Sequence, residues 1–347
     1  MTLSELVAGR ASGTHSYCGH PAAADFGDAN AEYMALAEGT ALLDFGWRRT
    51  LLASGSERSR FLHGQLSNDI ASLKQGEGCA ALLLTPQGRV VSILAVYDEG
   101  DVLRLVVDGD RVADTLARLE SVLVADDVEL ARGQDCCRIG LVGPQAAGIL
   151  TAAGFSPPPP AWSVSEGRLW NLPVTLYQRG DLARPCWDIA VGQNDGVELW
   201  ERIESAGAVA TGTRAYEALR VQSGTARYGM DVDEGRIAVE ARLEWAIHFD
   251  KGCYVGQEVI ERIVSRGRVN RRLCLVVLEA DIAPGSRLDG GKESDLLTSV
   301  VDCPGVGTLG LAYLPAGSDV CGKEVSFCSP SATVAAKVLE WPRTESA

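Results

Sequence analysis

One long apolar run that is interrupted a single time constrains the fold of this chain most strongly. Residues 81–97, ALLLTPQGRVVSILAVY, are strand-like except at Pro86, Gln87 and Gly88, which favour a turn. The run therefore predicts a β-hairpin. The flanking segments 54–69 and 111–123 carry apolar residues at helical spacing, so we expect helices beside the strands. Residues 138–154 repeat the order of strand, glycine and helix, which suggests two similar α+β halves.

The pattern changes after Arg272, where short apolar runs alternate with turn residues. The runs are LCLVVL, TSVV, TLGLAYL and EVSF, separated by PGS, DGG and PAGSD. This alternation is typical of an all-β domain, and closing such strands into a small barrel would remove exposed sheet edges. Further upstream, Pro157–Pro160 predicts a stiff surface connector.

Composition excludes several classes of protein. The net charge of −14 over 347 residues argues against general binding of nucleic acid or anionic lipid. No apolar run approaches the ~18 residues of a membrane span, and Met1 to Arg10 lacks the features of a secretory signal, so we expect a cytoplasmic protein. The ten cysteines include no CxxC pair, which predicts mostly reduced thiols and no stable metal site.

The segment Phe249–Leu273 carries the richest chemistry. Its apolar spacing predicts a helix that starts near Val255 or Gly256, with Cys253 just before it. The free amides of a helix start, together with the Lys251 cation, would favour a thiolate. Gly252 and Gly256 would let a ligand approach the sulfur. The alternative is a structural cysteine buried in a tight turn.

Basic residues are concentrated around the same segment of this acidic chain. They outnumber the two local acids, Glu258 and Glu261, and such a patch suits carboxylate or phosphate ligands. A solvated basic face is the competing interpretation. The basic residues are Lys251, Arg262, Arg266, Arg268, Arg271 and Arg272.

The octapeptide KGCYVGQE and the following VNRRL resemble the signature of the YgfZ family, within the superfamily of the glycine-cleavage T-protein, an aminomethyltransferase. The resemblance extends to ALLDFGWRRTLLASGSERSRFLHGQLSNDI, ALLLTPQGRV, ALRVQSGTARYGMDVDE, VEARLEWAI and GTLGLAYL. It implies two α+β subdomains around a central folate cleft, at about 40–135 and 136–268 within a region 1–268. A small β-barrel would follow at 269–347.

The resemblance also implies a function. The family binds tetrahydrofolate or a derivative and supports the assembly or repair of iron–sulfur enzymes, including enzymes that thiolate tRNA. Its partners would be folate and iron–sulfur or cluster-assembly proteins, without a membrane or direct contact to nucleic acid. Mapped onto this chain, Cys253 is the working residue. The other motif positions are Lys251, Gly252, Tyr254, Gly256, Gln257 and Glu258.

Departures from the aminomethyltransferase pattern bear on catalysis. Where that enzyme has an acidic pair, this chain has Ser92 and Ile93, neither of which can replace a carboxylate. Glycine-cleavage activity is therefore not expected, and Tyr216 stands where the T-proteins have an arginine. The residues expected to contact folate, or alternatively to form structural ion pairs, are Asp188, Arg220, Tyr228, Asp231, Glu240 and Arg262. His63 is expected on a helix surface.

Three functions remain open at this point. The first is a folate-dependent accessory factor, in which Cys253 attacks a sulfur or one-carbon adduct or briefly ligates iron. The second is a folate-dependent one-carbon transferase or demethylase that uses another acid, with Asp188 and Glu240 as the candidates. The third is a scaffold that has kept the fold and lost folate. Cys274 is the only cysteine near Cys253 in sequence, so Cys253 would offer a cluster a single ligand. A cluster shared with a second protein therefore also stays open.

Overall fold

The interrupted apolar run forms a hairpin at one edge of a five-stranded antiparallel sheet. The computed structural model describes residues 1–156, 158–265, 267 and 269–342. The hairpin joins β5 and β6, and Gly88 in its turn has a φ of 72°. Helices α3 and α4 bury their apolar sides against this sheet. The elements in sheet order are β5 (Gly78–Leu84), β6 (Val90–Asp98), β7 (Leu103–Asp108), β4 (Arg48–Ser54) and β8 (Glu129–Arg132), with α3 (Arg58–Gln65), η1 (Gly109–Arg111) and α4 (Val112–Glu120).

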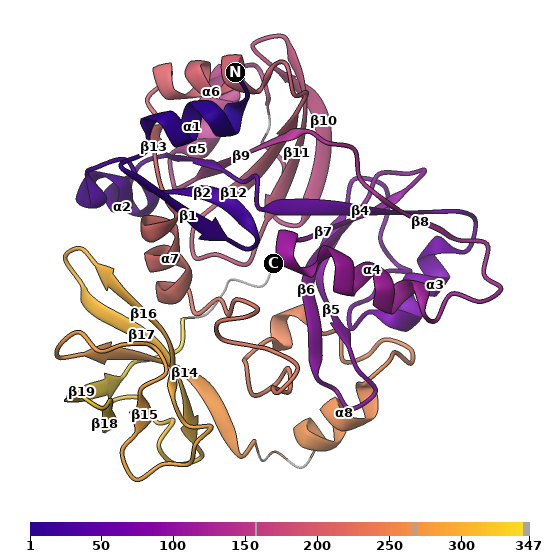
Figure 1. The fold of residues 1–347 in the computed structure, drawn as a ribbon. Coiled ribbons are helices and arrows are strands. Elements are labelled where there is room, and N and C mark those ends of the chain that lie inside the picture. The colour runs from indigo at the N-terminus through magenta and orange to yellow at the C-terminus, as the bar shows by residue number, and fades with distance from the viewer. Residues whose placement is uncertain (157, 266, 268, 343–347) are drawn as a thin grey trace.

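A second, six-stranded sheet lies beside the first (Figure 1). Its strand β3 comes from residues 41–44, so the chain enters this sheet before it builds the other one. Pro157 of the predicted connector lies outside the described residues. The sheet and its covering helices comprise β10 (Ser163–Leu169), β11 (Leu172–Arg179), β12 (Cys186–Val191), β9 (Cys137–Val142), β3 (Ala41–Asp44), β13 (Val209–Ala210), α1 (Leu3–Arg10), α5 (Ala146–Ala152) and α6 (Gly196–Ser205).

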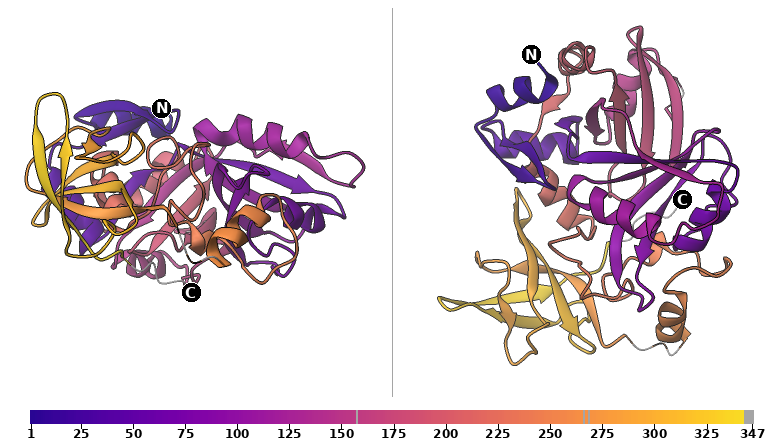
Figure 2. Two further views of the ribbon diagram at one scale, coloured as in Figure 1. Left: turned by 90° about the horizontal axis from the view of Figure 1, so that it is seen from below. Right: turned by 45° about the vertical axis from the view of Figure 1, so that its right-hand side comes forward.

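The C-terminal strands form a third sheet, which is antiparallel and set apart from the other two (Figures 1 and 2). It curls into a half-barrel over its own apolar core. Its strands are β15 (Arg287–Leu288), β18 (Glu324–Cys328), β19 (Thr333–Val338), β14 (Arg271–Leu278), β17 (Gly307–Pro315) and β16 (Leu297–Cys303). The remaining elements are β1 (Gly13–Tyr17), β2 (His20–Asp25), α2 (Ala29–Ala37), α7 (Thr213–Gln222), η2 (Glu244–Ala246) and α8 (Gln257–Ser265).

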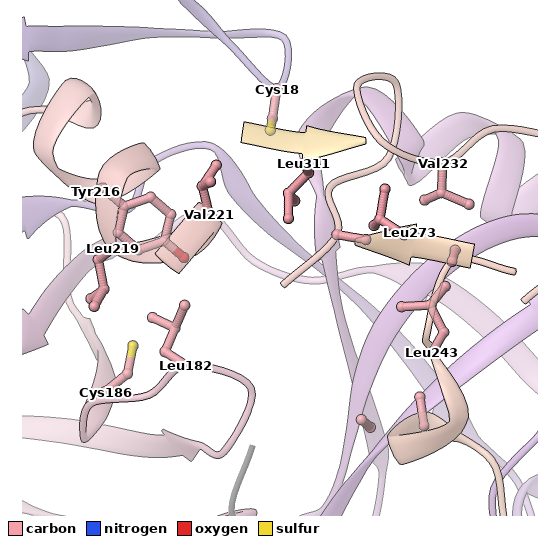
Figure 3. Packing of buried hydrophobic residues seen from close by; sticks show 14 of the residues in the cluster. Cys18, Leu182, Cys186, Tyr216, Leu219, Val221, Val232, Leu243, Leu273 and Leu311 are labelled. Atoms are coloured by element: carbon pink, nitrogen blue, oxygen red, sulfur yellow. The ribbon is translucent and has the colours of Figure 1, made fainter. Parts of the chain in front are cut away.

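The largest hydrophobic core lies where all three sheets meet. It includes Tyr216 and Leu219 of α7, Leu243 of the following segment, and Leu273 and Leu311 of the half-barrel, all shown in Figure 3. Burial of apolar surface from every part of the chain holds the three sheets together. Helix α7 is central to this arrangement because it packs against β2, α2, β16 and β17.

A buried ion pair reinforces that junction. Arg220 on α7 donates to Asp231 at 2.6 Å, to the Thr225 carbonyl at 2.7 Å and to Ser299 of β16 at 2.8 Å. Glu217 accepts two further bonds from Arg220, at 2.9 and 2.7 Å. Asp231 in turn accepts from Thr298 and Ser299, each at 2.6 Å. One guanidinium therefore joins α7, the loop after it and the half-barrel.

We expect Arg220→Met to lower the free energy of unfolding by about 3–5 kcal/mol, because it leaves buried carboxylates without their partner. Arg214→Met on the same helix is the control, since the Arg214 side chain is 72% exposed and pairs with Asp25 at the surface. That change should cost no more than about 1 kcal/mol. Urea unfolding measures both, and equal losses in the two variants would contradict the role given to Arg220.

Candidate functional site

A cleft opens at the junction of the five-stranded sheet, the six-stranded sheet beside it and the segment that follows α7. Its walls come from β4 to β7, from residues 179–181, from α7 and from the loop 225–228. It contains a narrow cavity of about 60 Å³ within about 650 Å³ of space free of protein atoms, its open mouth included. Concave sites of this kind, lined by aromatic residues and a few polar groups, are the usual place for a small ligand.

Aromatic side chains line much of the cleft. Trp162 and Trp245 lie nearly parallel, with ring centroids 6.2 Å apart and an angle of 18° between their planes. Tyr17 packs edge-on against Trp47, at 4.8 Å between centroids. Tyr228 also lines the cleft, and the Arg111 guanidinium lies 4.3 Å from the centre of its ring. Flat aromatic walls of this kind suit a planar heterocycle.

Two carboxylates and several guanidinium groups supply the polar contacts of the cleft. Burial raises the pKa of Asp108, and the nearby Arg48 opposes that shift. The pKa of Asp181 is raised in the same way, although Arg179 donates to both of its oxygens, at 2.9 Å for the Nε bond. Arg227 lies over the Tyr17 ring, 4.6 Å from its centre. The cleft thus offers acceptors and cations side by side.

The residues that replace the acidic pair lie on opposite faces of β6. Ile93 lines the cleft, whereas Ser92 is fully buried and its hydroxyl has no partner among the described residues. Strand β6 pairs with the neighbouring β7, and this ladder ends at Ala95 and Val106. Asp108, two residues further along β7, also lines the cleft. A carboxylate is therefore present on the same wall, one strand away from the apolar Ile93.

The predicted ligand contacts divide into two groups. Arg220 and Tyr228 line the cleft, and Asp231 lies behind Arg220 in the junction described above. Asp188 instead is 1% exposed and pairs with Arg138 of β9, with a shortest contact of 2.6 Å.

Glu240 and Arg262 lie elsewhere. The Glu240 carboxylate is 3.5 Å from Arg271 of the half-barrel. Arg262 lies on a shallow surface groove beside α8, together with Phe249 and Glu258. Ligand contact by Asp188, Glu240 or Arg262 stays a prediction for which the cleft lining provides no support.

The cysteine motif forms an ordered loop in front of α8. Cys253 is exposed, which differs from the alternative of a buried structural thiol. Helix α8 begins at Gln257, so Cys253 lies four residues before it and not directly at its start. Gly256 has a φ of 90°, and a Cβ there would lie 2.7 Å from the Thr85 carbonyl. The loop is therefore docked tightly on the turn between β5 and β6.

Lys251 makes contacts that the sequence does not indicate. Its ammonium donates to the carbonyls of His63, Leu66 and Asn68, at 2.7 Å for Leu66 and 2.8 Å for Asn68. These groups lie at the C-terminal end of α3, where a cation satisfies carbonyls that the helix leaves without donors. Burial lowers the pKa of Lys251 to about 8. All three of its N–H bonds thus hold the loop against α3.

His63 and Asp69 form a pair beside this loop that the sequence did not indicate. The imidazole is half-buried, not fully at the surface as predicted, and its Nδ1 lies 3.1 Å from the Asp69 carboxylate. Burial, followed by the Lys251 charge, lowers the pKa of His63. A Cβ at Gly252 would lie 3.5 Å from the Nε2 atom of His63. An imidazole therefore faces the residue that precedes Cys253.

The basic patch does not form one surface. Arg271 belongs to β14 and lies near Glu240 and Asp295, whereas Lys251 is buried against α3. Arg266 and Arg268 lie outside the described residues. In the described part of the chain, no three His, Cys, Asp or Glu side chains are grouped to hold a metal ion. Within the same ranges, no helix is both long and apolar enough to cross a membrane.

The fold and the cleft define a protein of two sheet-and-helix halves that enclose a ligand site, with a half-barrel at the C-terminus. The chain matches the model of the GCVT N-terminal domain over residues 12–251. It therefore belongs to this family, which confirms the T-protein-like part of the sequence resemblance.

Individual relatives agree with this membership. A putative chloroplastic transferase of Arabidopsis thaliana is 26% identical over 83% of this chain and 68% of its own length. An aminomethyltransferase of Nostoc sp. is 26% identical over 86% of this chain and 83% of its own. The crystal structure of a glycine cleavage system aminomethyltransferase T from Bartonella henselae superposes with a TM-score of 0.88 at 20% identity, covering 97% and 96% of the two chains. The predicted fold class is confirmed, and the cytoplasmic location stays a prediction.

We expect Lys251→Met to lower the free energy of unfolding by about 2 kcal/mol, because three carbonyls at the end of α3 lose their donor. Lys74→Met is the control, since Lys74 is exposed. Urea unfolding at pH 7 measures both variants. Unchanged stability of Lys251→Met would show that the cap contributes nothing.

The same lysine predicts a pH dependence. Its pKa is about 8 in the folded chain and 10.5 ordinarily, so between these values the unfolded chain binds more protons. The stability of the wild-type protein relative to Lys251→Met should therefore rise as the pH increases from about 8 to about 10.5. Unfolding of both proteins across this range tests the sign, and a constant or falling difference would contradict the assignment.

Proposed function

We propose that this protein binds tetrahydrofolate in the cleft and acts, through Cys253, as an accessory factor of the YgfZ type for the assembly or repair of iron–sulfur enzymes. One observation favours this role over aminomethyl transfer. The apolar Ile93 lines the cleft where the transferase pattern has an acid, while Cys253 is exposed on an ordered loop. A site built this way favours folate binding and thiol chemistry over the glycine-cleavage reaction.

The residues of the cleft fit a reduced folate. The amino-pyrimidinone ring of a pterin carries several N–H donors, and Asp108 and Asp181 are carboxylate acceptors in the cleft. Trp162 and Trp245 would contact the flat parts of the molecule, and Arg227 could receive a carboxylate of its glutamyl tail. When bound, tetrahydrofolate supplies a carrier for one-carbon units. The protein's own residues would bind and orient it and exclude water.

The proposed role of Cys253 follows from its setting. The loop is fixed by the Lys251 bonds to α3 and by the contact of Gly256 with Thr85, yet its thiol is exposed to a partner protein. An exposed thiol offers a single nucleophile or a single ligand to an iron–sulfur cargo. The His63 imidazole, whose pKa is lowered, is a neutral base near this loop at pH 7.

Cys253→Ala should give a folded protein that fails to restore the activity of iron–sulfur enzymes in cells that lack their own factor of this type. Cys321→Ala is the matched control, because Cys321 is the other cysteine that is exposed among the described residues. The readouts are enzyme activity in lysates and the thermal unfolding of each variant. Full restoration of activity by Cys253→Ala would reject the proposed role.

Folate binding can be measured through the three tryptophans of the cleft. Tetrahydrofolate should quench tryptophan emission in a saturable manner, because Trp47, Trp162 and Trp245 line the site. Asp181→Asn should weaken binding at least about tenfold, which is the value of one charge-assisted hydrogen bond. Asp195→Asn, a change in the exposed turn before α6, is the control. A clean absence of binding by calorimetry would instead favour a scaffold that has lost folate.

Asp108 supports a second candidate, a folate-dependent one-carbon transferase or demethylase. It lies on the cleft wall one strand away from Ile93, and burial raises its pKa, which favours the protonated form that a general acid needs. It replaces Asp188 and Glu240 as the acid to test. Turnover of an aminomethyl or N-methyl donor, lost in Asp108→Asn even at saturating tetrahydrofolate, would support this candidate. Tight folate binding without turnover would favour the accessory role.

A further inference from the structure

Four arginines line a second cavity beside the central cleft, and one of them, Arg48, lines the central cleft as well. Arg48 and Arg49 begin β4, and Arg132 and Arg138 bound the segment between β8 and β9. They line a cavity of about 300 Å³, which is called the arginine pocket below. Among the described residues that line it, Asp135 is the one acid. This concentration of positive charge is unusual in a chain with a net charge of −14.

The two inner arginines each keep a buried nitrogen without a partner. Arg138 is 3% exposed, and Asp188 accepts its Nε and Nη2 bonds at 3.0 and 2.6 Å. Its Nη1 atom has no hydrogen-bond partner in the described ranges. Arg48 is 5% exposed and donates from Nη2 to the Tyr216 hydroxyl at 3.0 Å, while its Nε likewise has no partner there. Buried guanidinium donors of this kind favour an acceptor in the adjoining space.

The outer arginines complete the pocket from the solvent side. Arg49 and Arg132 are both exposed, so they can move toward a ligand at the mouth of the cavity. Two of the four guanidinium groups come from β4, one from the end of β8 and one from β9, so an anion would receive donors from more than one direction. A tetrahedral phosphate accepts bonds from several directions, whereas a planar carboxylate matches a single guanidinium fork.

We propose that the arginine pocket is an anion site for a small molecule that carries a phosphate group. Asp188 holds Arg138 in place through a buried ion pair. This pair serves the arginine pocket and is not needed for the central cleft. The site does not depend on Cys253 or on folate. If phosphate does not bind in the arginine pocket, the proposed function is unaffected. If the proposed function is wrong, the proposal for the arginine pocket is unaffected.

Cys136 provides a local probe, because it is half-buried and lines the arginine pocket. The full-length protein is treated with iodoacetamide while inorganic phosphate is titrated against sodium chloride at equal ionic strength, and peptides are analysed by mass spectrometry. Phosphate should slow labelling of Cys136 in a saturable way and leave labelling of the exposed Cys321 unchanged. Equal labelling of Cys136 in phosphate and chloride would overturn the proposal.

Two paired variants locate the binding site. Arg49→Gln with Arg132→Gln should weaken phosphate protection at least about tenfold, since each lost guanidinium removes a charge-assisted bond. Arg214→Gln with Arg287→Gln removes the same charge from exposed positions elsewhere and should leave protection unchanged. Equal loss in both double variants would indicate a general charge effect and reject the site. Equal protection by acetate would reject the preference for phosphate.

Discussion

The Arg220 guanidinium is the interaction on which the arrangement around the cleft depends. All of its donors are used, and they reach α7, the loop 225–231 and β16 of the half-barrel. A buried arginine costs free energy to desolvate, and that cost is offset only when every partner is in place. The pair with Asp231 therefore fixes one relative position of the parts that line the cleft, which a purely apolar junction would define less sharply.

Strand β5 lies between the central cleft and the side of the sheet on which α3 and the cysteine loop pack. Ala80 lines the cleft on one face, whereas its neighbour Cys79 packs against the core under α3 on the other. The segment from Trp245 to Cys253 connects them, because Trp245 lines the cleft and Lys251 caps α3. The Ala246 carbonyl accepts a bond from Ser67 at 2.6 Å along the way. A short, well-anchored stretch of chain therefore links the wall of the cleft to the cysteine loop.

The sequence predicted the elements that are determined by residues close together along the chain. The turn at Gly88, the strands after Arg272 and the helix after Cys253 follow from periodicity and turn residues, which act over a few positions. The bonds of Lys251 could not be predicted, because their acceptors lie more than 180 residues away in α3. Asp108 was missed because no local pattern marks it. Its place on the cleft wall depends on how β6 and β7 pair and on which face of β7 it lies.

We infer that the central cleft and the exposed thiol act as one unit. This inference is tested most directly by the rate at which Cys253 is alkylated as a function of pH, measured with and without tetrahydrofolate, with Cys321 as the internal reference in the same samples. Tetrahydrofolate should change the rate at Cys253 and leave the rate at Cys321 unaltered. Identical profiles for Cys253 under saturating tetrahydrofolate would contradict it.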